Sequence, residues 1–153
     1  MPNTDPFISA LHRWMEVSMH HSMHNFFRFT RDNGLSMSQI GALFHLHRMG
    51  CTGVTDLGDH LGVSSAAASQ MLERLVQQGL ILRSEDPNDR RVKQIVLTDK
   101  GCGILEGSIR ARQVWLNDLG ETLPDSAKEQ IVTALNLLVE QADPIGKSIT
   151  PEC

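Results

Sequence analysis

The chain has 153 residues, of which 41% are hydrophobic and 21% charged, and its formal net charge is −4. This length and composition are typical of one globular domain with a buried core, and the sequence holds no internal repeat or low-complexity segment. The negative net charge excludes a protein that is basic over its whole surface. The excess of acidic residues lies in 101–153, which contain four basic and eight acidic residues. A locally basic DNA-binding surface is therefore still compatible with the sequence, because exposed charges more than about 8–10 Å apart are largely screened at physiological salt.

No stretch approaches the roughly 20 apolar residues that span a bilayer. The first residues also lack the basic region and apolar run of a signal peptide. The three cysteines, Cys51, Cys102 and Cys153, form no CxxC pair, and an odd number makes a poor disulfide framework. We therefore expect a cytoplasmic protein with no membrane partner.

Asp5 and Pro6 predict the start of a long helix, since aspartate is a favoured N-cap and proline favours the first helical position. Gly34 predicts its end, so we expect a helix over 5–33. Its apolar positions form a broad face: Phe7, Ile8, Leu11, Trp14, Met15, Val17, Met19, Phe26 and Phe29. This face is wider than one small domain needs, which predicts burial against a second copy of the chain.

A second helix is predicted to begin at Ser36, because Ser36 and Gln39 have the spacing of a capping box. Its apolar residues are Ile40, Leu43, Phe44 and Leu46. Met49 and Gly50 should close it.

The next stretch predicts a helix-turn-helix. Thr55 is a candidate N-cap for a short helix to about Leu61, and Gly62 can adopt the positive φ that turns the chain. Ser64 then caps a second helix that Gly79 stops. An apolar stripe recurs along that helix at three- and four-residue spacing: Ala68, Met71, Leu72, Leu75 and Val76.

A β-hairpin is predicted directly after Gly79. Apolar residues at 80–82 and β-branched residues within 92–97 flank a turn at 86–89, whose sequence is Asp-Pro-Asn-Asp. Arg90, Arg91 and Lys93 make the tip of this hairpin cationic.

Two further helices are predicted after the hairpin, one capped by Thr98 and stopped by Gly120, the other opened by Pro124. We therefore expect a mainly α fold in a single domain, 1–153. A winged helix-turn-helix at 35–98 lies between N- and C-terminal dimerisation helices at 5–33 and 99–143. We expect residues 144–153 to form a flexible tail with little to bury.

The order of short helix, Gly-Val-Ser turn, second helix, Asp-Pro-Asn-Asp-Arg-Arg and Val-Leu-Thr resembles the multiple-antibiotic-resistance-regulator (MarR) family of bacterial transcription factors. The motifs cover roughly Leu35 to Thr98. The resemblance implies a homodimeric, ligand-responsive repressor that binds a palindromic operator in double-stranded DNA. It also implies that the aspartate and second arginine of the wing tip, Asp89 and Arg91, matter most for binding.

The candidate DNA-binding residues lie on the second helix of the helix-turn-helix and on the hairpin tip. On the helix they are Ser64, Ser65, Ala66, Ala67, Ser69, Gln70 and Arg74, and at the tip Asp89, Arg90, Arg91 and Lys93. Small and polar side chains allow a helix to enter a major groove about 12 Å wide and reach base edges. Asp89 can orient Arg91 for the minor groove, while Arg90, Lys93 and Arg74 suit phosphates.

The resemblance further implies a small aromatic or acidic organic effector, held between the outer helices and the DNA-binding unit. The candidate effector residues combine aromatic bodies with titratable nitrogens: Trp14, His20, His21, His24, Phe44 and His45. A metal-responsive regulator of the same fold is an alternative, because His20 and His24 have the i, i+4 spacing of a metal half-site. No cysteine or acidic ligand stands at matching spacing, so we expect no metal and no cofactor.

An enzyme is the contrasting class of function. The sequence holds no Gly-rich phosphate loop, GxSxG or HExxH motif, so we expect no catalytic activity. A protein-interaction module that uses the hairpin without DNA is a third interpretation. Redox sensing is a fourth, but Cys51 is the first cysteine and the chain has no tyrosine, unlike the peroxide-sensing branch of the family.

Overall fold

The computed structural model describes residues 5–49, 54–85 and 93–142. The chain divides into two compact units. The first unit is described over 5–25 and 112–142, and the second over 26–49, 54–85 and 93–111. The first and fifth helices each contribute residues to both units.

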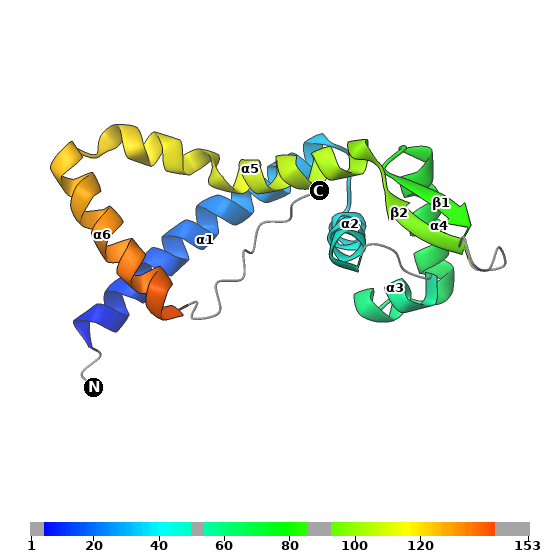
Figure 1. Cartoon of the computed structure of the whole chain (residues 1–153), viewed down its shortest axis with the longest axis horizontal. Coiled ribbons are helices and arrows are strands. Elements are labelled where there is room, and N and C mark those ends of the chain that lie inside the picture. The colour runs from blue at the N-terminus through cyan, green and yellow to red at the C-terminus, as the bar shows by residue number, and fades with distance from the viewer. Residues whose placement is uncertain (1–4, 50–53, 86–92, 143–153) are drawn as a thin grey trace. The chain divides into compact units, whose positions relative to one another are not determined.

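The described residues form a mainly α structure with one two-stranded sheet, as predicted (Figure 1). The elements are α1 (Pro6–Asp32), α2 (Met37–Met49), α3 (Val54–Leu61), α4 (Ser65–Gln77), β1 (Ile81–Glu85), β2 (Lys93–Leu97), α5 (Asp99–Thr122) and α6 (Asp125–Ala142). Within the described ranges, no helix has the length and apolar character needed to cross a membrane.

Three glycines in the left-handed region end α1, α3 and α4, as the sequence predicts. The φ angles of Gly34, Gly62 and Gly79 are 66°, 66° and 70°. At the end of α4, the Leu80 N–H donates to the Leu75 carbonyl (2.9 Å) and the Gly79 N–H to the Val76 carbonyl (2.9 Å). This is the Schellman pattern, which satisfies carbonyls that a helix end otherwise leaves unpaired.

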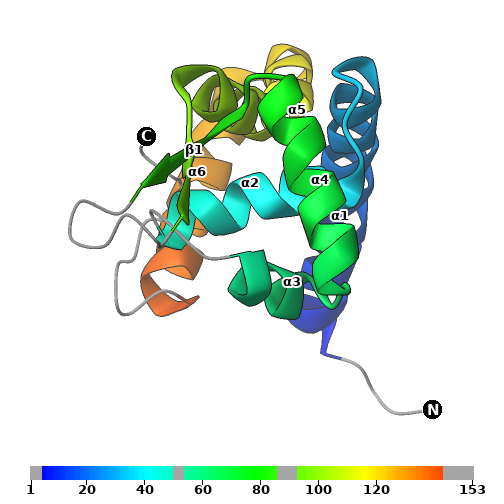
Figure 2. The same cartoon turned by 90° about the vertical axis from the view of Figure 1, so that its right-hand side faces the viewer.

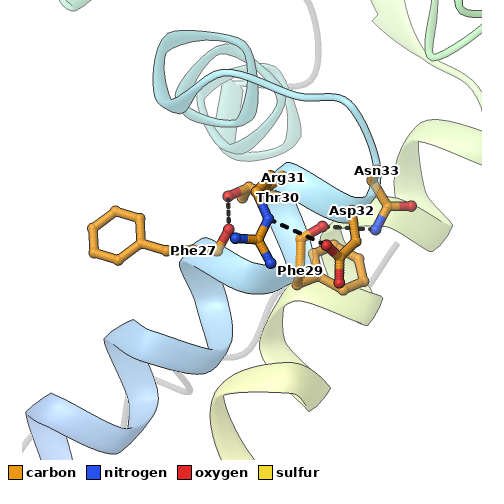
Figure 3. A network of polar contacts seen from close by, with 6 residues as sticks. All are labelled: Phe27, Phe29, Thr30, Arg31, Asp32 and Asn33. Carbon is orange, nitrogen blue, oxygen red and sulfur yellow. Dashed lines mark hydrogen bonds and ion pairs between the residues drawn. The ribbon is translucent and has the colours of Figure 1, made fainter.

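The end of α1 adds side-chain bonds to the same pattern (Figure 3). The Thr30 hydroxyl donates to the Phe27 carbonyl (2.9 Å), and the Asn33 amide donates to the Phe29 carbonyl (2.8 Å). These bonds hold the last turn of α1 before Gly34 redirects the chain toward α2.

Four of the predicted N-caps are present. Ser36 and Gln39 form the capping box: the Gln39 N–H donates to the Ser36 hydroxyl (3.2 Å), and the Ser36 N–H donates to the Gln39 amide oxygen (2.8 Å). The other three caps also accept backbone N–H bonds on their side chains: Asp5 from Phe7, Ser64 from Ala67 and Thr98 from Gly101.

Two predicted helix boundaries are wrong. Helix α3 already includes Val54, so Thr55 lies inside its first turn, a shift of one residue that local signals often fail to resolve. Helix α5 continues through Gly120 to Thr122. Glycine costs a helix only about 1 kcal/mol, whereas Pro124 disfavours the helical conformation of the residue before it, so the proline ends the helix.

The core of the second unit draws on every element from α2 to α5. Its fully buried large side chains are Ile40, Leu43 and Leu46 of α2, Leu57 of α3, Leu72 and Leu75 of α4, Ile81 of β1, Ile95 of β2 and Leu105 of α5. Helix α2 packs against α3, α4 and β2, and α4 packs against α3 and β1 (Figure 2). The strands pair antiparallel, with Ile81 opposite Leu97 and Glu85 opposite Lys93. The helix-turn-helix and hairpin therefore share one core.

In the first unit, apolar side chains of all three helices are exposed on the single chain. Helix α6 contains no buried residue, and Leu137 and Val139 are 60% and 63% exposed. Phe7 and Met15 of α1 and Val114 of α5 are also exposed. This is more apolar surface than a soluble monomer usually leaves in water.

Candidate nucleic-acid interface

Helix α4 buries one face and exposes the other. Ala68, Leu72 and Leu75 on the inner face are completely buried. The seven candidate DNA-binding residues at the start and on the outer face are all exposed: Ser64, Ser65, Ala66, Ala67, Ser69, Gln70 and Arg74. The helical period thus brings together short and polar side chains on one accessible surface, with a single arginine near its end.

A groove of about 200 Å³ adjoins this face. It is lined by Ser36, Ser38, Gln39, Val63, Ala67, Gln70, Met71 and Arg74. Three predicted residues of α4 therefore meet the start of α2, where Ser36 and Ser38 were not predicted as site residues. The capping box indicates that a helix begins at Ser36, but only the packing of α2 against α4 brings that end beside Gln70.

The hairpin is connected to α4 by an ion pair. Arg83 of β1 lies with its Nη2 3.2 Å from Oε2 of Glu73 on α4. Both side chains are exposed, so the pair stabilises the fold by at most about 1 kcal/mol. It nevertheless connects the strand β1 to the helix α4. Asp89, Arg90 and Arg91 lie outside the described residues, and Lys93 is described only as the first residue of β2.

The start of α5 fixes the turn between α4 and β1. The Thr98 hydroxyl donates to the Gly79 carbonyl (2.8 Å), the Thr98 N–H to the Leu80 carbonyl (3.1 Å), and the Lys100 ammonium to the Gln78 carbonyl (2.8 Å). Gly101 approaches this turn so closely that a Cβ there would overlap the carbonyl oxygen of Leu80. The base of the hairpin is therefore held against the end of α4.

Four of the six candidate effector residues, Trp14, His20, His21 and His24, belong to the first unit. The ring of His21 stacks on Trp115 of α5, with centroids 5.0 Å apart and an interplanar angle of 18°. The Trp14 and Trp115 centroids are 5.9 Å apart. Trp14 and His21 thus both contact the ring of Trp115, a residue that was not predicted as part of the site.

The other two candidate effector residues, Phe44 and His45, belong to the second unit and are half-buried. His45 lies against His60 of α3. In the first unit, the rings of His20 and His24 have centroids 6.5 Å apart. Across the described part of the chain, no group of three or more histidine, cysteine or acidic residues is arranged to hold a metal ion.

The sequence from α2 to the first residue of β2 matches a family model. The model is that of the MarR family, and it covers residues 35–93. The HTH-type transcriptional regulator YwhA of Bacillus subtilis is 30% identical over 95 residues, which are 62% of this chain and 68% of that protein. The chain belongs to the MarR family.

Two other relatives come from the same bacterium. The HTH-type transcriptional regulator YfiV is 28% identical over 104 residues, covering 68% of this chain and 65% of YfiV. The HTH-type transcriptional repressor MdtR is 34% identical over 68 residues, covering 44% of each protein. The match thus spans between 44% and 68% of the length of these three relatives.

Solved structures share the fold of this MarR-family chain. The multiple antibiotic-resistance repressor MarR of Listeria monocytogenes has a TM-score of 0.73 at 20% identity, over 88% of this chain and 94% of that one. MepR of S. aureus, solved with DNA, has a TM-score of 0.62 at 21% identity, over 84% and 96%. BpsR of Bordetella bronchiseptica, whose DNA binding is regulated by 6-hydroxynicotinic acid, has a TM-score of 0.51 at 21% identity, over 82% and 90%. At these identities the likeness is one of fold.

Proposed function

We propose that this protein is a sequence-specific DNA-binding transcriptional regulator, which acts as a repressor in the form of a homodimer and leaves its operator when it binds a small organic effector. The observation that carries the proposal is the outer face of α4, where seven short or polar residues are exposed and the opposite face is buried in the core. Membership of the MarR family and the likeness to a DNA-bound MepR support it.

The exposed face of α4 has the size and chemistry of a recognition helix. Ser65, Ser69 and Gln70 supply hydrogen-bonding groups for base edges in the major groove, while the methyl groups of Ala66 and Ala67 suit contact with thymine. Arg74 can reach a phosphate from the rim of the groove beside the start of α2. Ser64, which caps the helix through its side chain, remains exposed beside the backbone of the DNA in this docking.

The wing, which is the hairpin of β1 and β2, adds DNA contacts to those of the recognition helix. In our proposal Asp89 orients Arg91 for the minor groove, and Arg90 and Lys93 contact phosphates. The Glu73–Arg83 ion pair supports this arrangement because it connects β1 to α4. When α4 lies in the major groove, the direction of the strands is then set by that of the helix. The ion pair also balances the charge of Glu73, the acidic residue next to Arg74, where phosphate would approach.

The exposed apolar surface of the first unit supports the proposed homodimer. A second copy of the chain would bury side chains such as Phe7, Leu137 and Val139, which one chain leaves exposed. Two-fold symmetry would place two copies of α4 in successive major grooves, so the operator should be an imperfect palindrome with half-sites about 10 base pairs apart.

Selection of genomic DNA fragments, followed by binding assays at two salt concentrations, tests the proposed function. The purified protein should retain fragments that share a palindrome, and its affinity should fall steeply with salt because phosphate contacts release counterions. Retention of no fragment, or of random fragments with equal affinity, would contradict sequence-specific binding. A monomer at micromolar concentration in analytical ultracentrifugation would contradict the dimer.

We propose that the effector binds beside the rings of Trp14, His21 and Trp115, of which His21 and Trp115 are stacked. Their flat apolar faces suit an aromatic ring, and the imidazole of His21 suits a carboxylate. The regulation of BpsR by 6-hydroxynicotinic acid supports this class of ligand. Release from DNA requires that the ligand prefer a DNA-incompetent arrangement, and a shift from mostly bound to mostly free needs several kcal/mol of differential affinity.

Thermal unfolding and DNA binding in the presence of simple aromatic acids test the effector proposal. A millimolar aromatic acid should raise the melting temperature and weaken operator binding, and His21→Ala should reduce both effects. If instead a bound transition metal controlled DNA binding and His20→Ala or His24→Ala removed it, the metal-responsive alternative would replace the organic effector.

A further inference from the structure

The two ends of the hairpin that adjoin helices are joined by three consecutive hydrogen bonds. The chain enters β1 from the end of α4 and leaves β2 into α5. Three carbonyls in a row precede β1, those of Gln78, Gly79 and Leu80. The first accepts from the Lys100 ammonium (2.8 Å), the second from the Thr98 hydroxyl (2.8 Å) and the third from the Thr98 N–H (3.1 Å). Residues 78–80 and 98–100 thus form one junction at the base of the wing.

The Lys100 bond differs from the two bonds of Thr98. The Thr98 bonds belong to secondary structure, because its N–H extends the antiparallel ladder and its hydroxyl also caps α5. Lys100 is exposed and has neither role. Its ammonium joins α5 to Gln78, the C-cap of α4, whose own N–H donates to the Arg74 carbonyl (2.9 Å). A cation is favourable there because the last carbonyls form the negative end of the helix dipole.

A small change of angle at the junction displaces the far end of the wing. Glu85 and Lys93, the last described pair of the ladder, lie four positions beyond the pair of Ile81 and Leu97. At about 3.3 Å per residue they are about 13 Å away, so a rotation of about 10° at the junction displaces them by about 2 Å. Hydrogen bonds form only over distances of about 2.7–3.2 Å. Simultaneous DNA contacts by α4 and the wing therefore require a fixed angle at the junction.

We propose that Lys100 is a positioning residue for DNA recognition. Its bond to the Gln78 carbonyl keeps the wing at the angle to α4 at which both contact one operator half-site. The inference rests on the proposed function and assigns no DNA contact to Lys100 itself. Loss of the ammonium should weaken operator binding more than binding to random DNA, because phosphate contacts carry no sequence information and tolerate small displacements.

The affinities of Lys100→Met for operator and random DNA test the proposal, with Arg110→Met as the matched control. Both residues are exposed cations of α5, but Arg110 pairs with Glu106 of its own helix (3.3 Å). Lys100→Met should weaken operator binding by about three- to tenfold and change binding to random DNA by less than about twofold. Arg110→Met should change neither affinity. Lys100→Arg, which keeps a charged donor, should restore operator binding.

A double-variant cycle with Arg91→Ala separates positioning from the other roles that Lys100 could have. If Lys100 acts through the wing, Lys100→Met should weaken operator binding by less than about twofold once Arg91 is alanine. Losses that multiply in the double variant would overturn the proposal. Equal losses on operator and random DNA would also overturn it, because they indicate a direct phosphate contact.

Full operator preference in Lys100→Met would restrict Lys100 to a structural role and overturn the inference while the proposed function stands. A wild type without operator preference would contradict the proposed function, and this inference with it. The two failures are therefore distinguished by the wild-type measurement alone.

Discussion

Replacement of Gly101 by alanine should destabilise the protein, although alanine is the better helix former. Gly101 lies in the first turn of α5 and is buried. An added Cβ would overlap the carbonyl oxygen of Leu80 and lie 3.0 Å from Cδ2 of Leu97. The Leu80 carbonyl cannot move freely, because it belongs to the backbone that joins α4 to β1 and accepts the Thr98 N–H (3.1 Å).

The expected magnitude follows from two opposing effects. Alanine gains at most about 1 kcal/mol of helix propensity over glycine. Overpacking against fixed atoms costs about 1–3 kcal/mol, and more where the backbone must shift. The second effect wins at this position, so Gly101→Ala should lower the free energy of unfolding by about 1–2 kcal/mol.

Gly103→Ala is the matched control for this prediction. Gly103 lies two residues further along α5, is exposed, and has open space where a Cβ would be added. This variant should gain about 0.5–1 kcal/mol from helix propensity alone. Urea unfolding followed by circular dichroism at 222 nm measures both variants. If Gly101→Ala were as stable as Gly103→Ala, the close packing of α5 against the turn before β1 would be refuted.

Four further substitutions test the wing, the core, and the ion pair between the hairpin and α4. Arg91→Ala should weaken operator binding by about 1–3 kcal/mol with little effect on binding to random DNA. Lys93→Ala should weaken binding to both kinds of DNA alike and reduce the slope of log affinity against log salt concentration by about one. Competition assays at several salt concentrations separate the two results. Leu72→Ala should cost about 2–5 kcal/mol in urea unfolding because it leaves a cavity in the core, and a loss below about 1 kcal/mol would contradict its complete burial. Glu73→Gln should change the free energy of unfolding by less than about 1 kcal/mol, because its partner Arg83 is exposed. It should weaken operator binding if the ion pair orients the wing. Unchanged operator affinity would contradict that role.

Local signals predicted the helix-turn-helix well because each acts within a few residues. The positive φ of Gly62 and Gly79, the Ser64 cap and the Ser36–Gln39 capping box all involve groups within six positions of each other. The period of the buried residues in α4 likewise indicated which face would be exposed. These features required no knowledge of the rest of the fold.

Boundaries and contacts between distant segments could not be predicted in this way. Gly120 looked like a helix stop, but α5 continues past it, because a single glycine lowers helix propensity without excluding the helical conformation. The stacking of His21 on Trp115 and the approach of His45 to His60 depend on which helices pack together, and no local pattern encodes that choice.

The measurement that tests the central proposal most directly is the affinity of the protein for its selected operator relative to a scrambled sequence, measured by fluorescence anisotropy. The wild type should prefer the operator by about a thousandfold or more at physiological salt. The double variant Ser69→Ala/Gln70→Ala should lose most of that preference and keep its binding to scrambled DNA, because it removes base contacts and leaves the phosphate contacts. Gln130→Ala, which changes an exposed residue of α6, should behave like the wild type. A double variant that keeps the full operator preference would contradict recognition by the exposed face of α4.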